Sequence, residues 1–236
     1  MQGGNVIFLK IFLRYGIPCG KIGEKERIIM KKLLYKLQAR FLTRFGNIKV
    51  FKWPFFIVYD PTVFSMPGEK IMQVRDMLKP GDIILRGFSM YLDGMFVPGD
   101  YSHGAIYVGD DTIIHAVAEG VSKINVIDFC ECDRICIVRP QSGQELAIKR
   151  ALEFVENDVP YDFGFKRGAS ALYCFELCAE CYKELGVKPI KKSALCGLIK
   201  KRVFLAESFQ NSESFERVFE FNPKRNVDFV VEEEEA

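Results

Sequence analysis

Apolar residues follow two different periods along the chain. Residues 24–45 contain no glycine or proline, and their apolar positions recur at the spacing of an amphipathic helix; they are Met30, Leu33, Leu34, Leu37, Phe41 and Phe45. From about residue 82 onward, apolar residues instead form short runs between turn residues, which is typical of strands. The pattern predicts a helical N-terminal region followed by a domain rich in antiparallel strands.

The second region can be divided into individual elements. A short amphipathic helix is expected over 69–78, because Lys79-Pro80-Gly81 then forms a turn signature. The remaining predicted elements are strands at 82–86, 103–108, 112–117, 121–127 and 135–139, and helices at 145–157 and 172–185. The short spacer at 109–111 makes the second and third strands a tight hairpin. The pattern after Pro189 is mixed and predicts no particular element.

Residues 87–101 form a long loop that carries several apolar side chains. A loop of this length in a compact domain is often functional. Two interpretations remain open from the sequence. The loop is either a lid over a substrate or a surface loop folded over its own side chains.

Charge is distributed unevenly, although the net charge of the 236 residues is only +2. Residues 1–52 hold 12 Lys or Arg against 2 Glu, whereas the rest of the chain holds 21 against 29 acidic residues. Basic residues recur every four positions beside the apolar stripe of the first helix; they are Lys32, Lys36, Arg40 and Arg44. This helix either lies on an anionic membrane surface or packs on the core with a solvated basic face. The acidic body argues against nucleic acid as a partner.

Composition and segment lengths narrow the class of protein. With 49% apolar and 27% charged residues, the chain is globular rather than disordered. No apolar run reaches the roughly 20 residues needed to span a bilayer, and no segment makes a convincing signal peptide. We therefore expect a cytoplasmic protein, in peripheral contact with a membrane if the basic helix binds one. The eight cysteines are then expected to be reduced thiols.

The chain has only two histidines, so any imidazole chemistry must use His103 or His115. Both lie on the predicted hairpin, 12 positions apart, and antiparallel pairing brings them near each other. Two adjacent imidazoles can act as a base and as the group that orients it. Cys174 falls in the first turn of the helix predicted at 172–185, where the positive end of the helix dipole favours a thiolate. A thiolate–imidazolium pair with a bell-shaped pH–rate profile is expected.

These motifs resemble the NlpC/P60 cysteine hydrolase superfamily. Ser102 to Gly109, followed by Ile113-Ile114-His115-Ala116, is similar to its histidine hairpin. Because Tyr173-Cys174-Phe175-Glu176-Leu177 follows the histidines, the order resembles that of the circularly permuted YiiX/YebB-like branch. The resemblance implies an α+β, permuted papain-like fold with a small antiparallel sheet packed on helices.

The resemblance also implies roles for individual residues. Cys174 would be the nucleophile, His103 the general base, and either His115 or Glu119 the orienting group. Tyr173 would lie near the substrate. Phe175 stands where the family usually has serine. The implied domain boundaries are a basic helical extension at 1–68, a catalytic domain at 69–220 and an acidic tail at 221–236.

The resemblance implies a thiol hydrolase that cleaves an amide or ester in a peptide, an N-acyl compound or a lipid-like substrate, without a cofactor or a metal. Two alternatives remain. An acyltransferase similar to the lecithin retinol acyltransferase group would share the fold, although its Asn-Cys-Glu-His motif is absent. A non-catalytic ligand-binding module is the other. Most other cysteines are interpreted as core residues, with a thiolate metal site as the alternative; the residues concerned are Cys130, Cys132, Cys136, Cys178 and Cys181.

Overall fold

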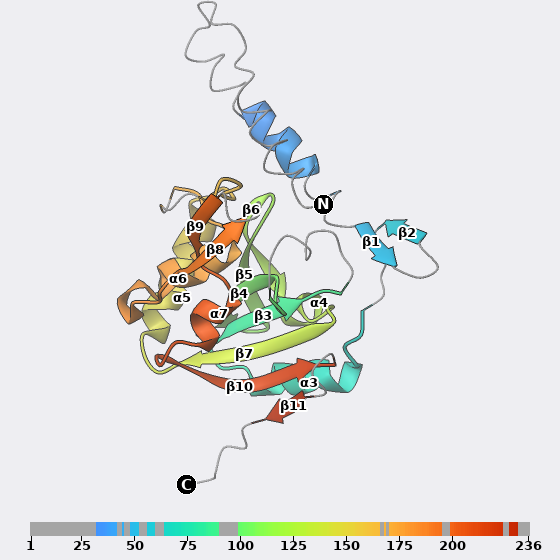
Figure 1. The fold of residues 1–236 in the computed structure, drawn as a ribbon. Coiled ribbons are helices and arrows are strands. Elements are labelled where there is room, and N and C mark those ends of the chain that lie inside the picture. The colour runs from blue at the N-terminus through green and yellow to red at the C-terminus, as the bar shows by residue number, and fades with distance from the viewer. Residues whose placement is uncertain are drawn as a thin grey trace, which may run out of the picture.

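A seven-stranded antiparallel sheet forms the centre of the computed structural model (Figure 1). The structure describes residues 32–41, 44, 48–51, 56–59, 64–89, 99–165, 168, 170–194, 199–223 and 227–230. The strand order is β11-β10-β7-β3-β4-β5-β6. Their bounds are β3 Ile83–Gly87, β4 His103–Gly109, β5 Thr112–Val117, β6 Gly120–Asn125, β7 Arg134–Pro140, β10 Phe215–Asn222 and β11 Val227–Val230.

Helices cover both faces of this sheet, because its central strands are apolar on both sides. In β3, Ile83 and Leu85 join one core cluster while Ile84 joins another, as the alternation of side chains along a strand requires. The first cluster packs against α5 (Gln144–Glu156), α6 (Cys174–Cys181) and α7 (Ala206–Gln210). The second packs against α3 (Gly68–Met77) and α4 (Val126–Phe129). The predicted α+β fold with an antiparallel sheet is confirmed, and the sheet is larger than expected.

Most elements predicted from hydrophobic period are present within a residue or two. The hairpin is β4 and β5 as predicted, and the helix at 69–78 is α3. The strand predicted at 121–127 is wrong at its end, since β6 stops at Asn125. The Asn125 side chain accepts a hydrogen bond from the Ile127 backbone N–H at 2.8 Å, which caps the short helix α4. The helix predicted at 172–185 is shorter: α6 is followed by a 3₁₀ turn at Lys183–Leu185.

Strands also occur in regions where the sequence predicted none. Within the predicted helical extension, β1 (Ile48–Phe51) and β2 (Phe56–Tyr59) pair as an antiparallel hairpin. After Pro189, β8 (Ile190–Ala194) pairs with β9 (Ile199–Val203), and β10 pairs with β7 in the main sheet. The proposed boundary at 220/221 falls inside β10, and β11 lies in the stretch predicted as an acidic tail. The apolar loop residues 90–98 and the last six residues lie outside the described part of the chain.

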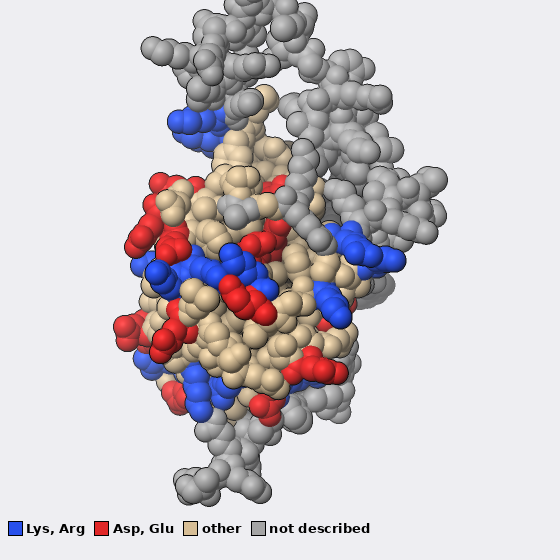
Figure 2. Space-filling view, turned by 90° about the vertical axis from the view of Figure 1, so that its left-hand side faces the viewer, with Lys and Arg blue, Asp and Glu red and all other residues tan. Residues whose placement is uncertain are grey.

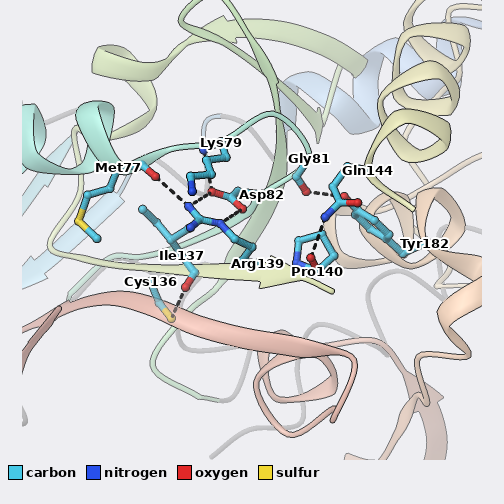
Figure 3. A network of polar contacts seen from close by, with 10 residues as sticks. All are labelled: Met77, Lys79, Gly81, Asp82, Cys136, Ile137, Arg139, Pro140, Gln144 and Tyr182. Carbon is cyan, nitrogen blue, oxygen red and sulfur yellow. Dashed lines mark hydrogen bonds and ion pairs between the residues drawn. The ribbon is translucent and has the colours of Figure 1, made fainter. Parts of the chain in front are cut away.

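A buried ion pair joins the end of α3 to the centre of the sheet (Figure 3). Arg139 on β7 donates to both carboxylate oxygens of Asp82, from Nε at 3.0 Å and from a terminal nitrogen at 2.9 Å. The same guanidinium donates to the Met77 backbone carbonyl at 2.8 Å, and Asp82 accepts from the Lys79 N–H at 2.8 Å. The Asp82 side chain is 2% exposed. The network therefore fixes the turn between α3 and β3, which the sequence shows only as Lys79-Pro80-Gly81-Asp82.

Asp82→Ala is expected to lower the free energy of unfolding by roughly 3 kcal/mol, because it leaves the Arg139 guanidinium without its carboxylate in a largely buried place. Urea denaturation measures this loss. Arg75→Ala is the matched control, since Arg75 pairs with Asp111 on the surface, with exposed fractions of 41% and 34%. The control is expected to leave the unfolding midpoint nearly unchanged. Equal losses in the two variants would contradict a structural role for the buried pair.

Candidate active site

The β4–β5 hairpin brings the two histidines into contact. Gly109, Asp110 and Asp111 adopt positive φ angles of 99°, 49° and 53°, which close the tight turn. The register pairs Ala105 with His115, so His103, the first residue of β4, lies two residues before the partner of His115. His103 Nε2 and His115 Nδ1 are 3.2 Å apart, and the rings meet edge to face with centroids 5.3 Å apart. The structure thus joins the two histidines through one hydrogen bond.

Cys174 is the first residue of α6, which begins after Tyr173. No side chain caps this helix end, so its first backbone N–H groups are available to other acceptors. The backbone N–H groups of Gly104, Phe175 and Cys174 itself lie near enough to the thiol to act against the rise in its pKa. Gly104 directly follows His103 in the chain. The thiol therefore lies near the start of β4 in the first core cluster, whereas the His103 ring contacts Phe129 of the second cluster, on the other face of the sheet.

Glycine at position 104 permits this approach of α6 to the sheet. A Cβ atom placed there would lie 2.8 Å from Phe175 Cδ1, closer than real Cβ contacts allow. Phe175 is 1% exposed and is packed in the first core cluster. Phe175, which stands where the family usually has serine, therefore packs against Gly104.

Arg86 and Phe129 complete the surroundings of the imidazoles, and neither residue belongs to a motif recognisable in the sequence. The Arg86 guanidinium lies 4.3 Å from the centre of the Phe129 ring and donates to the Phe129 carbonyl at 3.1 Å. The same ring lies 5.8 Å from His103 and 6.1 Å from His115, between centroids. Arg86 is also the cross-strand partner of His103. In the sequence, the position of Arg86 at the end of the strand predicted at 82–86 is the feature that could indicate its place beside the histidines.

Burial keeps the candidate catalytic groups uncharged at rest. Desolvation, together with the positive charge of Arg86, places the pKa of His103 well below its usual value and lowers that of His115 to about 4. Desolvation raises the pKa of the Cys174 thiol to about 11, although the three backbone N–H groups and Arg86 act in the opposite direction. Near pH 7 the thiol and both imidazoles are therefore neutral. This differs from the expected thiolate–imidazolium pair, because the sequence did not show how deeply the site is buried.

In His103→Ala, where the neighbouring imidazole is absent, the rate of Cys174 alkylation by iodoacetamide is expected to rise about tenfold for each pH unit between pH 7 and pH 10, since the thiolate fraction does so below a pKa of about 11. Peptide mapping by mass spectrometry separates this rate from those of the other cysteines. Arg86→Gln is expected to move the profile to higher pH, because Arg86 lowers the pKa of the thiol. A rate in His103→Ala that is constant from pH 5 to pH 8 would contradict the raised pKa of the thiol.

The remaining candidate residues occupy different places. Glu119 is exposed in the turn between β5 and β6, beyond His115. Tyr173 is buried, and its hydroxyl accepts from the Phe204 backbone N–H at 2.6 Å, which ties the segment before α7 to the start of α6. Glu176 is also buried; it accepts from the Gly168 N–H at 3.3 Å, and burial raises its pKa to about 7.

The other described cysteines are all buried. Cys136, Cys178 and Cys181 belong to the first core cluster, whereas Cys130 and Cys132 belong to the second, on the opposite face of the sheet. Among the residues that the structure describes, no three or more His, Cys, Asp or Glu side chains are arranged to hold a metal ion. Their positions fit the interpretation as core residues.

A cysteine at the start of a helix that packs on an antiparallel sheet, with histidines on the neighbouring hairpin that precede it in sequence, defines the class of permuted papain-like proteins. The chain belongs to the permuted papain-like amidase family of YaeF and YiiX, family C92, whose model matches residues 77–218. The predicted permuted, YiiX-like branch is thereby confirmed.

The chain is also similar to viral proteins and to a solved bacterial structure. Protein OPG091 of Variola virus and that of Vaccinia virus (strain Copenhagen) are each 27% identical over 150 residues, covering 60% of this chain and 85% of the relative. The solved structure of yiiX from Escherichia coli O157:H7, described as a metalloprotein, superposes with a TM-score of 0.51 at 17% identity. That alignment covers 61% of this chain and 98% of the other. This structural likeness shows the shared fold.

Proposed function

We propose that this protein is a thiol hydrolase that cleaves an amide or ester bond through Cys174, His103 and His115. The observation that carries the proposal is the contact of 3.2 Å between His103 Nε2 and His115 Nδ1, on the hairpin whose Gly104 packs against Phe175 of α6, the helix that begins with Cys174. The family supplies the reaction class, since it is one of papain-like amidases. The assignment of roles to the three residues is our own.

The proposed reaction starts from neutral groups. His103 donates from Nε2 to His115 Nδ1, which leaves the His103 Nδ1 lone pair to take the thiol proton as sulfur attacks the substrate carbonyl. His115 fixes this tautomer and stabilises the imidazolium that forms. His103 then protonates the leaving amine or alcohol as the carbon–heteroatom bond breaks, and a thioester on Cys174 remains. Water, deprotonated by His103, attacks the thioester and releases the acid and the thiol.

The N-terminal end of α6 is suited to the charge that develops during this reaction. No side chain caps the start of α6, so its first backbone N–H groups are available to a carbonyl oxygen that becomes negative beside Cys174. The positive end of the helix dipole adds to this effect. The site thus combines a buried nucleophile with preorganised donors, as acyl transfer requires.

The fate of the acyl group distinguishes hydrolysis from acyl transfer to another acceptor. With an N-acyl amide or ester as substrate in ¹⁸O-labelled water, the released carboxylic acid is expected to carry the heavy oxygen. Addition of primary amines or alcohols is expected to leave the yield of acid nearly unchanged. Transfer of most of the acyl group to the added acceptor would instead assign the protein to the acyltransferases.

A further inference from the structure

The helix at residues 32–41 carries a large apolar surface that the described part of the chain leaves exposed. The exposed fractions are 56% for Leu33, 44% for Leu34, 52% for Leu37 and 63% for Phe41. At 3.6 residues per turn, these four side chains occupy an arc of about 100° on one side of the helix. We refer to these four residues as the apolar face of the N-terminal helix.

The opposite side of this helix is attached to the catalytic domain. The Tyr35 hydroxyl donates to the Ala118 backbone carbonyl at 3.1 Å and accepts from the Tyr161 backbone N–H at 3.1 Å. Its ring lies 5.7 Å from that of Phe163, between centroids, and Ala39 is buried. The apolar face is therefore held pointing away from the domain, and its exposure is a property of the docked helix.

Basic side chains lie along one edge of the apolar face. Lys32, Lys36 and Arg40 are exposed, and at helical spacing they lie between the apolar arc and the side that contacts the domain. Figure 2 shows a blue cluster at the top of the described surface, at the height of the N-terminal helix in Figure 1, whereas both signs of charge alternate over the body. An apolar face bordered by cations matches a surface of acyl chains beneath anionic headgroups.

We propose that this helix docks the protein on anionic lipid membranes, with the apolar face inserted below the headgroups and the basic residues paired with them. Among the described residues, no helix is long and apolar enough to cross a bilayer. Ala118, whose carbonyl accepts the Tyr35 hydrogen bond, directly follows β5, the strand that carries His115. Docking therefore brings the histidine end of the hairpin toward the membrane.

Flotation of the full chain with lipid vesicles tests this docking. Binding is expected to vesicles of phosphatidylcholine with about one-third phosphatidylserine, and to be much weaker with phosphatidylcholine alone. The triple variant L33Q/L37Q/F41Q is expected to lose at least about tenfold in partitioning, because it removes the inserted side chains. Replacement of Lys36 and Arg40 by glutamine is expected to cost about fivefold for each charge on anionic vesicles, and the loss should shrink at high salt.

Matched controls come from α5, on the surface of the same domain. Leu146 is 43% exposed and the Lys149 side chain is 72% exposed, so L146Q and K149Q remove the same kinds of group elsewhere. Both controls are expected to bind vesicles as the wild type does. Because all substituted positions are exposed, unchanged circular dichroism and unfolding midpoints confirm that each variant is folded.

Three results would overturn the proposal: no binding to anionic vesicles, equal binding by the triple variant, or a wild-type dimer that becomes monomeric in the triple variant without any vesicle binding. The last result would assign the apolar face to a second copy of the chain. C174A is expected to bind vesicles normally, which keeps failure of docking separate from failure of the proposed hydrolysis.

Discussion

Cys174→Ala is expected to reduce turnover of an amide or ester substrate by at least about a thousandfold, because no other group can form the thioester. The expected loss is in kcat, and the substrate is still bound. The matched control is Cys178→Ala, four residues further along α6, whose thiol is also buried and whose pKa burial raises far above the usual value. This control removes a core thiol from the same helix and is expected to retain most of the activity.

Comparison of the two cysteine variants separates chemistry from folding. Both are expected to show native circular dichroism, and both lose a similar small side-chain volume from the first core cluster. Retained turnover in C174A, or an equal loss in C178A, would contradict the assignment of the nucleophile.

His103→Ala is expected to lower kcat by about 10²- to 10⁴-fold, the usual contribution of a general base. His115 acts through His103, so His115→Ala is expected to lower kcat while KM stays nearly constant. His115→Asn, whose amide oxygen can still accept the His103 N–H, is expected to recover part of that loss. Measurement of kcat and KM across pH for the set of variants tests both roles.

Glu119 provides the control for the orienting residue, because it is exposed in the turn beyond β5. Glu119→Gln is expected to leave kcat and its pH profile unchanged. If E119Q lost as much activity as H115A while H115N showed no recovery, Glu119 would take the orienting role and the contact between the imidazoles would be structural.

Local patterns predicted the part of the fold that holds the histidines. The period of two in residues 103–108 and 112–117, joined by a glycine and two aspartates, is sufficient to predict β4, β5 and their turn. Because the side chains of a hairpin are placed by its register, the contact between His103 and His115 could also be predicted. Cys174 was recognisable from the helix that follows it.

Features that depend on tertiary packing could not be predicted in the same way. The pairing of β10 with β7 joins residues 215–221 to residues 135–140, and no local period indicates such a partner. Phe129 lies beneath the imidazoles only because the Asn125 cap turns the chain into α4. The neutral state of Cys174 and the histidines follows from burial by several elements, whereas the sequence showed only the helix dipole, which favours the thiolate.

The coupling of Cys174 to His103 is the central claim of this account, and the site of a covalent adduct tests it most directly. After treatment at pH 7 with an acyloxymethyl ketone, an electrophile that resembles an acyl substrate, peptide mapping is expected to find the adduct on Cys174. His103→Ala is expected to slow its formation by at least about a hundredfold, because the neutral thiol then lacks its base. An adduct mainly on another cysteine, or equal labelling of Cys174 in H103A, would contradict the account.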